Sequence, residues 1–463
     1  MTILLQEIII IAYLLLVLLV GLWAGKGVSG LKDYAIAGKS FGPLVIFATL
    51  SASFIGGGFS MGNAEKVFLI GITNIIALWG FSLKEILVAL FIAPRMERYP
   101  EAISVGDIME LHYGRSARIF GGIFGVALCA GILGAQVGAM GYIFNLFFGI
   151  DRVTGVLLGC GIVITYATIG GMRSVVWTDV IQFIVLAVGI PLTLYFGIKS
   201  AGGLDAVIQA VPASHLSLPS SLTGWTGLAA LFITFLLGET LVPPYLQRLL
   251  IGRGAGDVVK GTMFSGLFSI PFFAVTGCTG LVALAINPGL NANLAMPFVI
   301  QSALPPFFQG VVTAAIVSII MSSADSFLNS SAIAFSNDIV RPLSRKQLEP
   351  HKELLLARMT TLIVGLLAIL FALSIESILD ILVYAYNFWA PTVLVPLAAA
   401  LLGFKAHRRC FIAGACAGII ATVLWNTVLS TPYNIDGLVV GCFANLIVFF
   451  LVEKVFSENN KAE

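Results

Sequence analysis

The residues best able to do chemistry lie close together, in one apolar segment near residues 307–338. Adjacent serines, Ser322 and Ser323, with a backbone carbonyl one turn earlier, present three oxygens from one stretch of helix. Oxygens that together carry little net charge suit a small hard cation such as sodium. The alternative is that both hydroxyls bond back to carbonyls of their own helix.

An acidic residue follows these serines. Asp325 lies three residues after Ser322, so the two side chains share a helix face. A carboxylate inside a membrane costs about 2.5–3.5 kcal/mol on insertion scales, and it usually marks an ion path or a proton relay. The alternative is that Asp325 faces a water-filled cytoplasmic cleft and has no coupling role.

The composition indicates which solvent surrounds these residues. Of the 463 residues, 59% are hydrophobic and only 10% are charged, and the mean hydropathy is +1.02. Soluble domains carry roughly 25% charged residues, so this chain cannot present a water-compatible surface and we expect a lipid bilayer around it. The net charge of +2 says nothing about nucleic acid, but no basic patch with interleaved aromatic residues occurs, so we expect no nucleic-acid partner.

The usual signatures of enzymes do not occur in the sequence. The four histidines form no metal-binding pattern, and we find neither a nucleophile elbow nor a P-loop. The six cysteines are scattered without a C-x-x-C pair, so they are expected to be packing residues. We therefore predict a protein that is not an enzyme, with no catalytic residues and no cofactor.

Hydropathy predicts an all-α integral membrane protein with about 13 transmembrane helices, since a bilayer core needs about 20 apolar residues per helix. The first segment lacks the basic start of a signal peptide and is expected to be retained. We expect no soluble domain at either end and no obligatory protein partner. The segments lie near 5–25, 44–70, 72–93, 117–147, 153–171, 174–198, 225–247, 261–287, 307–338, 355–375, 379–403, 409–430 and 437–456.

The distribution of Lys and Arg predicts the orientation. Alternate loops hold nearly all of them, chiefly 24–42, 94–118, 248–260, 341–358 and 405–409. Positive loops stay in the cytoplasm, so the N-terminus is predicted outside and the C-terminus inside, in the plasma (inner) membrane. A short amphipathic stretch, Val105–Tyr113, is expected at the cytoplasmic interface.

Two of the segments are interrupted at corresponding places. The run Gly56–Gly58 lies midway through one, and Pro243 and Pro244 follow Gly238 and Glu239 in the segment five positions later. Glycine and proline both disfavour a continuous helix. Matching interruptions in two halves are typical of inverted-repeat transporters, whose unwound backbone lines the binding site. Close helix packing through small residues is the alternative for the glycines.

These interruptions divide the chain into a single transporter domain with internal symmetry. We predict a 5+5 inverted-repeat core, with the first repeat at 44–198 and the second at 225–404. Helix 5–25 and the two helices within 409–456 are expected to be peripheral.

Two motifs carry a family resemblance. Gly170–Gln182 (GGMRSVVWTDVIQ) resembles the signature of the sodium:solute symporter family, and Met321–Asn329 (MSSADSFLN) resembles that family's eighth core helix. The order of the helices agrees as well, so the resemblance covers nearly the whole chain. It implies the fold shared by amino-acid and sugar symporters of the inverted-repeat type.

The resemblance also implies where sodium binds. In the family, one site joins carbonyls of the broken first core helix to oxygens of the eighth. Here Ala52 and Ile55 match the first-helix carbonyls, Ile319 matches the eighth-helix carbonyl, and Ser322 and Ser323 match the hydroxyls.

Some members hold a second sodium ion nearer the cytoplasm. Asp179 matches its acidic ligand and Ser326 matches one hydroxyl, whereas Asp325 stands where the family has a small hydroxyl residue. If the two acids approach each other, a proton or a cation must lie between them. Asp325 therefore either strengthens a second cation site or makes coupling sensitive to protons.

The solute is expected near the first sodium. Polar residues at plausible depth are Gln136, Glu239, Tyr384, Tyr386 and Asn387, each of which has an ordinary packing role as its alternative. Lys84 also falls in an apolar segment and is expected to pair with a nearby acid.

Together these features predict a secondary active transporter that brings a small polar organic solute into the cell by alternating access. Sodium is the expected coupling ion. The alternatives are a proton-coupled symporter of the same fold, or a passive uniporter or channel, which would not need the sodium ligands.

Overall fold

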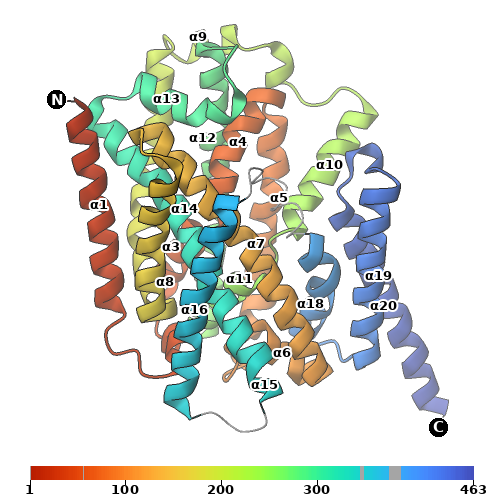
Figure 1. The fold of residues 1–463 in the computed structure, drawn as a ribbon. Helices are drawn as coiled ribbons and strands as arrows, with labels where there is room; N and C mark the ends of the chain where they lie inside the picture. Colours follow the sequence, from red (N-terminus) through yellow and green to blue (C-terminus); the bar gives the residue numbers. More distant parts are fainter. Residues whose placement is uncertain (1, 56, 345–348, 375–386, 463) are drawn as a thin grey trace.

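The computed structural model describes residues 2–55, 57–344, 349–374 and 387–462. Within these ranges every regular element is a helix, and the one β contact is an isolated bridge between Phe41 and Gly252. Figure 1 shows the helices gathered into one upright bundle. An all-α fold is thus confirmed.

The long helices follow the predicted apolar segments. Among the described residues, nine helices are long and apolar enough to cross a membrane, and a bent pair raises the number to ten. The principal helices are α1 (Thr2–Ala24), α3 (Pro43–Phe54), α4 (Gly57–Ile70), α5 (Thr73–Leu87), α7 (Arg115–Phe148), α8 (Arg152–Ser200), α10 (Leu222–Leu237), α11 (Pro243–Leu250), α12 (Ala255–Ile286), α14 (Pro306–Ile333), α16 (Pro350–Ser374), α18 (Val395–Leu402), α19 (Arg408–Val423) and α20 (Gly437–Ala462).

Helix α8 contains two predicted spans. Its 49 residues would extend about 74 Å if straight, more than twice a bilayer core of about 30 Å. Gly171 interrupts it with φ 52° and ψ −139°. A Cβ atom there would lie 2.4 Å from the Tyr34 carbonyl oxygen, so only glycine fits this junction. This break separates the predicted segments 153–171 and 174–198. The total of thirteen spans remains a prediction.

Both predicted interruptions are present. The axes of Pro43–Phe54 and Phe59–Ile70 differ by 50°. Helix α10 ends at Leu237 and α11 begins at Pro243, with Leu241 between them in a left-handed conformation, φ 56°. Pro243 and Pro244 occupy the first turn of α11, where a missing N–H costs nothing.

Helix α14 is the most enclosed of the long apolar helices in the described part. It packs against α8, α7, α1, α16 and α3, and 94% of its most apolar window is buried. At its C-terminal end it continues as a π-helical segment, η6 (Ala334–Val340). A polar stripe in such a helix must find partners within the protein.

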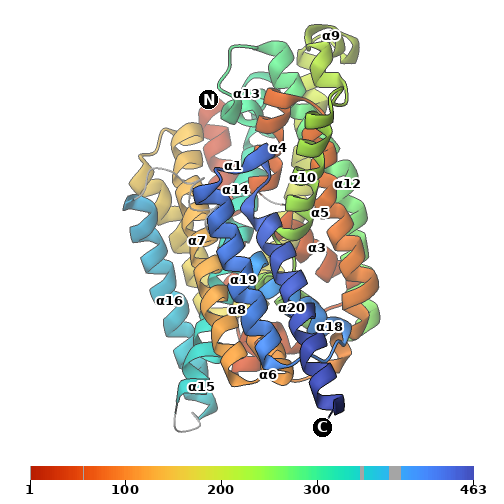
Figure 2. The same ribbon diagram turned by 90° about the vertical axis from the view of Figure 1, so that its right-hand side faces the viewer.

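The helices predicted to be peripheral are α1, α19 and α20. Helix α1 packs on α8 and α14, and α19 and α20 pack on each other; Figure 2 shows this last pair along one side of the bundle. Figure 1 places the start of α1 and the end of α20 at opposite ends, as an odd number of crossings requires. The division into two repeats stays a prediction.

The predicted interfacial stretch forms helix α6, with the predicted bounds Val105–Tyr113. Arg118 of α7 fastens it to the end of α14, because its guanidinium pairs with Asp107 at 2.9 Å and with Glu110, and donates to the Asn337 carbonyl at 2.8 Å. Asp338 accepts a hydrogen bond from Ser104, the residue that caps α6.

Candidate functional site

The two serines of α14 lie against the end of α3. Ser323 Oγ donates to the Ser53 carbonyl oxygen at 3.0 Å, and Ser322 Oγ lies 3.0 Å from Ser53 Oγ. Because these residues are about 270 positions apart in sequence, only the packing of α14 on α3 brings them together. Their hydroxyls bond across the helix interface and not solely within their own helix.

The carbonyl groups predicted for sodium flank this contact. Ala52 and Ile55 lie on either side of Ser53 at the end of α3, and both are buried. The Ile55 carbonyl accepts a hydrogen bond from Ser60 Oγ at 2.8 Å, across the bend. Ile319 is also buried, one turn before Ser323 in α14. The Ser322 and Ser323 hydroxyls thus lie near the Ser53 carbonyl, where α3 ends, and sodium binding by the predicted set stays a prediction.

Asp179 lies beside the same serines. Its carboxylate accepts hydrogen bonds from Thr49 and Ser322, and from Ser53 at 3.3 Å. It also forms a fully buried ion pair with Arg248, whose Nη2 lies 3.0 Å from Asp179 Oδ2. The acid predicted for a second cation therefore faces a guanidinium.

Arg248 uses each of its nitrogen atoms. Nε donates to Thr49 Oγ1 at 3.0 Å, Nη1 to the Pro244 carbonyl at 2.9 Å, and Nη2 to Ser53 Oγ at 2.6 Å and to Ser326. An arginine is always charged in proteins. A permanent cation thus stands among the residues predicted for the second cation.

The sequence analysis missed this role for Arg248. It counted Arg248 among the basic residues of the loop 248–260, which is wrong, because α11 extends to Leu250 and buries the guanidinium completely. One feature of the sequence could have indicated this role. Arg248 lies one residue past a predicted apolar segment, and a cation buried there needs an acidic partner.

Asp325 joins this cluster through hydroxyl groups. Its carboxylate accepts hydrogen bonds from Tyr166 Oη and from Ser326 Oγ, the latter at 3.1 Å. Among the described residues, Asp325 takes part in no ion pair. Ser326 therefore connects Asp325 to Arg248, and through it to Asp179.

The residues predicted to contact solute are more scattered. Gln136 is half-buried on α7, Glu239 is buried between α10 and α11, and Asn387 is half-buried. None of them takes part in the hydrogen bonds of Asp179 and the serines described above. Tyr384 and Tyr386 lie outside the described residues.

The prediction that Lys84 pairs with an acid is confirmed. Its Nζ lies 2.8 Å from Glu85 Oε1, and both side chains are buried. The partner is the next residue along α5. This pair and the Asp179–Arg248 pair both neighbour Phe54, the last residue of α3, whose ring centroid is 5.7 Å from Lys84 Nζ and 5.5 Å from Arg248 Cζ.

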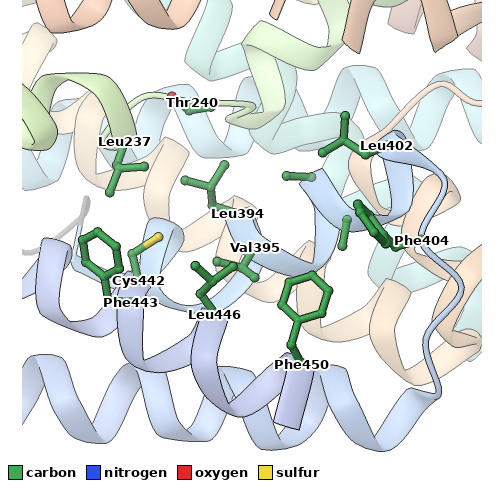
Figure 3. Close-up of a pocket in the computed structure, with 12 residues that line it drawn as sticks. Leu237, Thr240, Leu394, Val395, Leu402, Phe404, Cys442, Phe443, Leu446 and Phe450 are labelled. Atoms are coloured by element: carbon green, nitrogen blue, oxygen red, sulfur yellow. The ribbon is translucent and has the colours of Figure 1, made fainter. Parts of the chain in front are cut away.

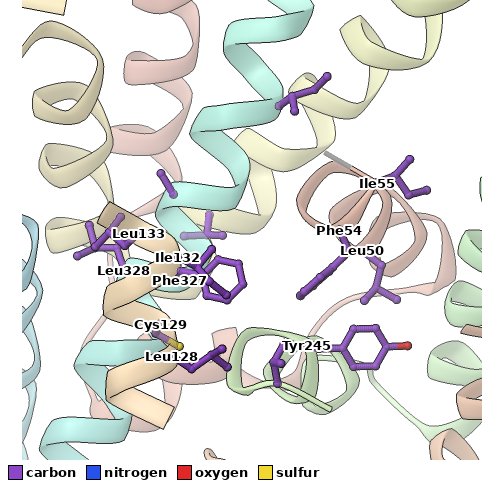
Figure 4. Close-up of a cluster of buried hydrophobic side chains, with 14 of the residues drawn as sticks. Leu50, Phe54, Ile55, Leu128, Cys129, Ile132, Leu133, Tyr245, Phe327 and Leu328 are labelled. Atoms are coloured by element: carbon purple, nitrogen blue, oxygen red, sulfur yellow. The ribbon is translucent and has the colours of Figure 1, made fainter. Parts of the chain in front are cut away.

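Apolar side chains enclose the cluster. Figure 4 shows Leu50 and Phe54 of α3 near Tyr245 of α11, with Phe327 of α14 opposite Phe54. The Phe54 and Tyr245 rings make an edge contact at 5.2 Å. Such surroundings exclude water and strengthen every electrostatic interaction inside them.

A cavity of the described part lies elsewhere. It measures about 290 Å³ and lies between α10, α18 and α20 (Figure 3). Its walls are apolar side chains such as Leu394, Phe443 and Phe450, and Thr240 and Cys442 are its only polar or sulfur-containing side chains among the described residues. It offers nothing that would bind a polar solute.

Known proteins resemble this chain over most of its length. The model of the sodium:solute symporter family matches residues 34–422. The chain is 24% identical to the high-affinity proline transporter PutP of Bacillus subtilis, over 94% of this chain and 95% of that one. It is 26% identical to the high-affinity choline transporter 1 of Drosophila melanogaster, over 86% of this chain and 67% of that one.

Solved structures resemble the whole fold. A Na+-coupled sialic acid symporter, in a substrate-bound outward-open state, matches with a TM-score of 0.83 at 20% identity, over 97% of this chain and 98% of the other. The nucleobase-cation-symport transporter Mhp1 matches with a TM-score of 0.63 at 13% identity, over 94% and 96% of the two chains. The match of the family model over most of its length shows that this chain belongs to the sodium:solute symporter family, a family of membrane transporters and not of enzymes.

Proposed function

We propose that this transporter uses the sodium gradient to bring a small polar organic solute into the cell by alternating access. The observation that carries the proposal is the contact between Ser323 and the Ser53 carbonyl, which places two hydroxyls of α14 at the bend after α3. A sodium ion bound there would join the first predicted repeat to the second.

The ion ligands in this proposal are the carbonyls of Ala52, Ile55 and Ile319 and the hydroxyls of Ser322 and Ser323. Sodium binding would exchange the present hydrogen bonds of the serines for ion contacts. Since Ser322 also bonds Asp179, the ion would lie beside a carboxylate whose charge is compensated by Arg248. A second cation at Asp179, Asp325 and Ser326 would have to displace the guanidinium.

The chemistry of the solute follows from the relatives. The names of three proteins described above state that they transport proline, choline and sialic acid. All three solutes are small polar organic molecules. We extend that general class to this chain. Solute contacts by Gln136, Glu239, Tyr384 and Asn387 remain part of the proposal.

The first test measures sodium linkage on the purified protein. A ligand that binds only the folded state raises its melting temperature by mass action, so sodium should stabilise the wild type more than potassium does. Ser322→Ala and Ser323→Ala should each weaken that difference. Ser331→Ala is the matched control, because Ser331 is buried on the same helix and donates within that helix, to the Leu328 carbonyl.

If both serine variants keep the wild-type sodium dependence, the site is misassigned. Solute uptake into vesicles with a sodium gradient, a proton gradient or neither then separates the mechanisms. Uptake driven by protons alone would favour the proton-coupled alternative, and uptake without any gradient would favour a uniporter.

The proposed orientation places the start of α1 outside and the end of α20 in the cytoplasm. It rests on the basic loops and on the opposite ends of the two helices. In a background without native cysteines, Ser344→Cys should react with impermeant reagents only from the cytoplasm, and Ser220→Cys only from outside. Labelling of both from one side would contradict the proposed topology.

A further inference from the structure

The ion pair on α5 lacks the hydrogen bonds that buried charges normally have. Beyond the 2.8 Å contact between Lys84 Nζ and Glu85 Oε1, neither Nζ nor either carboxylate oxygen of Glu85 has a hydrogen-bond partner in the described part of the chain. An ammonium group has three donors, and a carboxylate has about four lone-pair sites. Most of this capacity is therefore unused.

Aromatic rings surround the pair. Lys84 Nζ lies 3.8 Å from the ring centroid of Phe81 and 4.4 Å from that of Tyr245. The Tyr245 hydroxyl, like the Glu85 carboxylate, has no hydrogen-bond partner by geometry in the described part of the chain. Phe59 packs on Phe81 at 5.2 Å. Ring faces attract cations, but they cannot satisfy the carboxylate.

The pair also lies where the two interrupted helices meet. Phe54 ends α3, Tyr245 lies in the first turn of α11, and both rings contact Lys84. In inverted-repeat transporters, substrate sites lie near such interruptions. The unsatisfied charges thus lie beside both interruptions, enclosed by the surrounding helices.

A pair of this kind is expensive unless something else completes it. Apolar side chains of similar volume would serve stability equally well or better. Buried polar groups without partners call for an explanation such as a bound ligand. A ligand for this pair must supply an acceptor to Lys84 and a donor to Glu85.

We propose that Lys84 and Glu85 bind the two ends of a zwitterionic amino acid, the solute carboxylate at Lys84 and the solute ammonium at Glu85. This inference rests on the proposed function as a solute symporter. The pair and the solute are each neutral, so four charges alternate in sign and none is left alone. A solute with only a negative or only a positive charge would leave an excess charge in a dry site.

The rings define the remaining part of the site. Phe81, Tyr245, Phe54 and Phe59 present apolar faces around the pair, and these faces would pack against the carbon skeleton of the amino acid. The proposed site thus favours amino acids with apolar side chains.

The test begins with the wild-type protein in detergent and saturating sodium. Melting temperatures are measured with each of the twenty amino acids, and affinities by calorimetry for the best one. Its amide, which lacks the negative charge, and its N-acetyl derivative, which lacks the positive charge, should each bind roughly 10- to 100-fold more weakly, since each loses a charge-assisted hydrogen bond. Failure of all twenty amino acids to bind, or equal binding of either derivative, would overturn the proposal.

The second arm removes the pair. Lys84→Met combined with Glu85→Leu should keep or raise the melting temperature, yet lose amino-acid binding at least roughly tenfold. Glu65→Leu combined with Lys66→Met is the matched control, because these adjacent opposite charges lie on the neighbouring helix α4 and are half-buried and exposed. Unchanged amino-acid binding by the Lys84 and Glu85 double variant would reduce the pair to a structural role.

Sodium linkage separates this inference from the proposed function. The double variant should still be stabilised by sodium, because it keeps Ser322, Ser323 and Asp179. If amino acids do not bind but sodium linkage persists, only the solute assignment fails. If sodium does not stabilise even the wild type, the proposed function itself fails.

Discussion

Two buried ion pairs share the ring of Phe54 as a neighbour, and they are built in opposite ways. Asp179 and Arg248 are surrounded by hydroxyls and a carbonyl, so nearly every donor and acceptor is used. Lys84 and Glu85 have aromatic rings around them and no further hydrogen bond in the described part of the chain. The first pair is complete in itself, whereas the second needs a partner.

The difference shows that two buried ion pairs of one transporter can differ in how many of their hydrogen-bonding groups are satisfied. A saturated pair resists exchange, because a ligand must replace several good hydrogen bonds at once. In an unsaturated pair the desolvation penalty is not fully compensated, and a ligand that supplies the missing hydrogen bonds offsets it. The saturated pair thus suits the ion side of the site, next to the serines, and the unsaturated pair suits the solute side.

Removing Arg248 alone should give the largest effect. Arg248→Met leaves the Asp179 carboxylate buried without its cation, and breaking such a pair costs about 3–5 kcal/mol. We expect that loss of unfolding free energy in potassium. In sodium the loss should be smaller, because Asp179, Ser53 and Ser326 then offer oxygens to the ion.

The measurement is the melting temperature of Arg248→Met in sodium and in potassium. Arg248→Lys is the control, since it keeps a positive charge and should show a smaller ion dependence. Equal destabilisation of Arg248→Met in the two salts would show that no cation can replace the guanidinium.

Replacing each pair by apolar residues compares the two directly. Asp179→Leu with Arg248→Met deprives Thr49, Ser53, Ser322 and Ser326 of charged partners, and we expect a loss of about 2–4 kcal/mol. Lys84→Met with Glu85→Leu should cost about nothing or stabilise. Denaturant titration of both double variants tests this contrast; similar losses in the two would abolish the distinction between them.

Asp325 tests how far the saturated cluster extends. Two carboxylates near one ion should raise sodium affinity, and protonation should lower that affinity as pH falls. Asp325→Asn keeps size but removes the charge, so it should weaken sodium affinity and flatten its pH dependence, with a stability loss of about 1–2 kcal/mol. Sodium titrations at two pH values check this.

Tyr166→Phe is the matched control for that experiment. It removes the hydroxyl that donates to Asp325 but leaves the charge in place, so it should keep the pH dependence. If wild type and Asp325→Asn give identical sodium titrations, Asp325 has no role in sodium coupling, which would then depend only on Asp179 and the serines.

Phe54→Leu should have the smallest effect. It keeps an apolar side chain but removes the ring next to both cations, which costs about 1 kcal/mol. If Phe54 links the two pairs, the variant should also reduce the effect of sodium on amino-acid binding. Calorimetry with and without sodium measures that coupling, and an unchanged ratio of affinities would make the pairs independent.

Local sequence determined much of this protein. Apolar length predicted the helices, because a lipid-exposed backbone must satisfy its own hydrogen bonds. The glycines near residue 57 and the prolines Pro243 and Pro244 predicted both interruptions, since their effects on the backbone act locally. The spacing and the motif of Ser322 and Ser323 predict a sodium site, and that role stays a prediction.

Tertiary structure alone decided which charges meet. Arg248 follows an apolar segment and reads as a loop residue, yet it contacts Asp179, 69 residues away. Lys84 predicted an acid nearby, but nothing local showed that the pair would be enclosed by Phe54 and Tyr245 from two other helices. Periodicity fixes the face of each helix, whereas the rotation and depth at which helices pack depend on contacts between distant segments, and those contacts set the charge balance of the site.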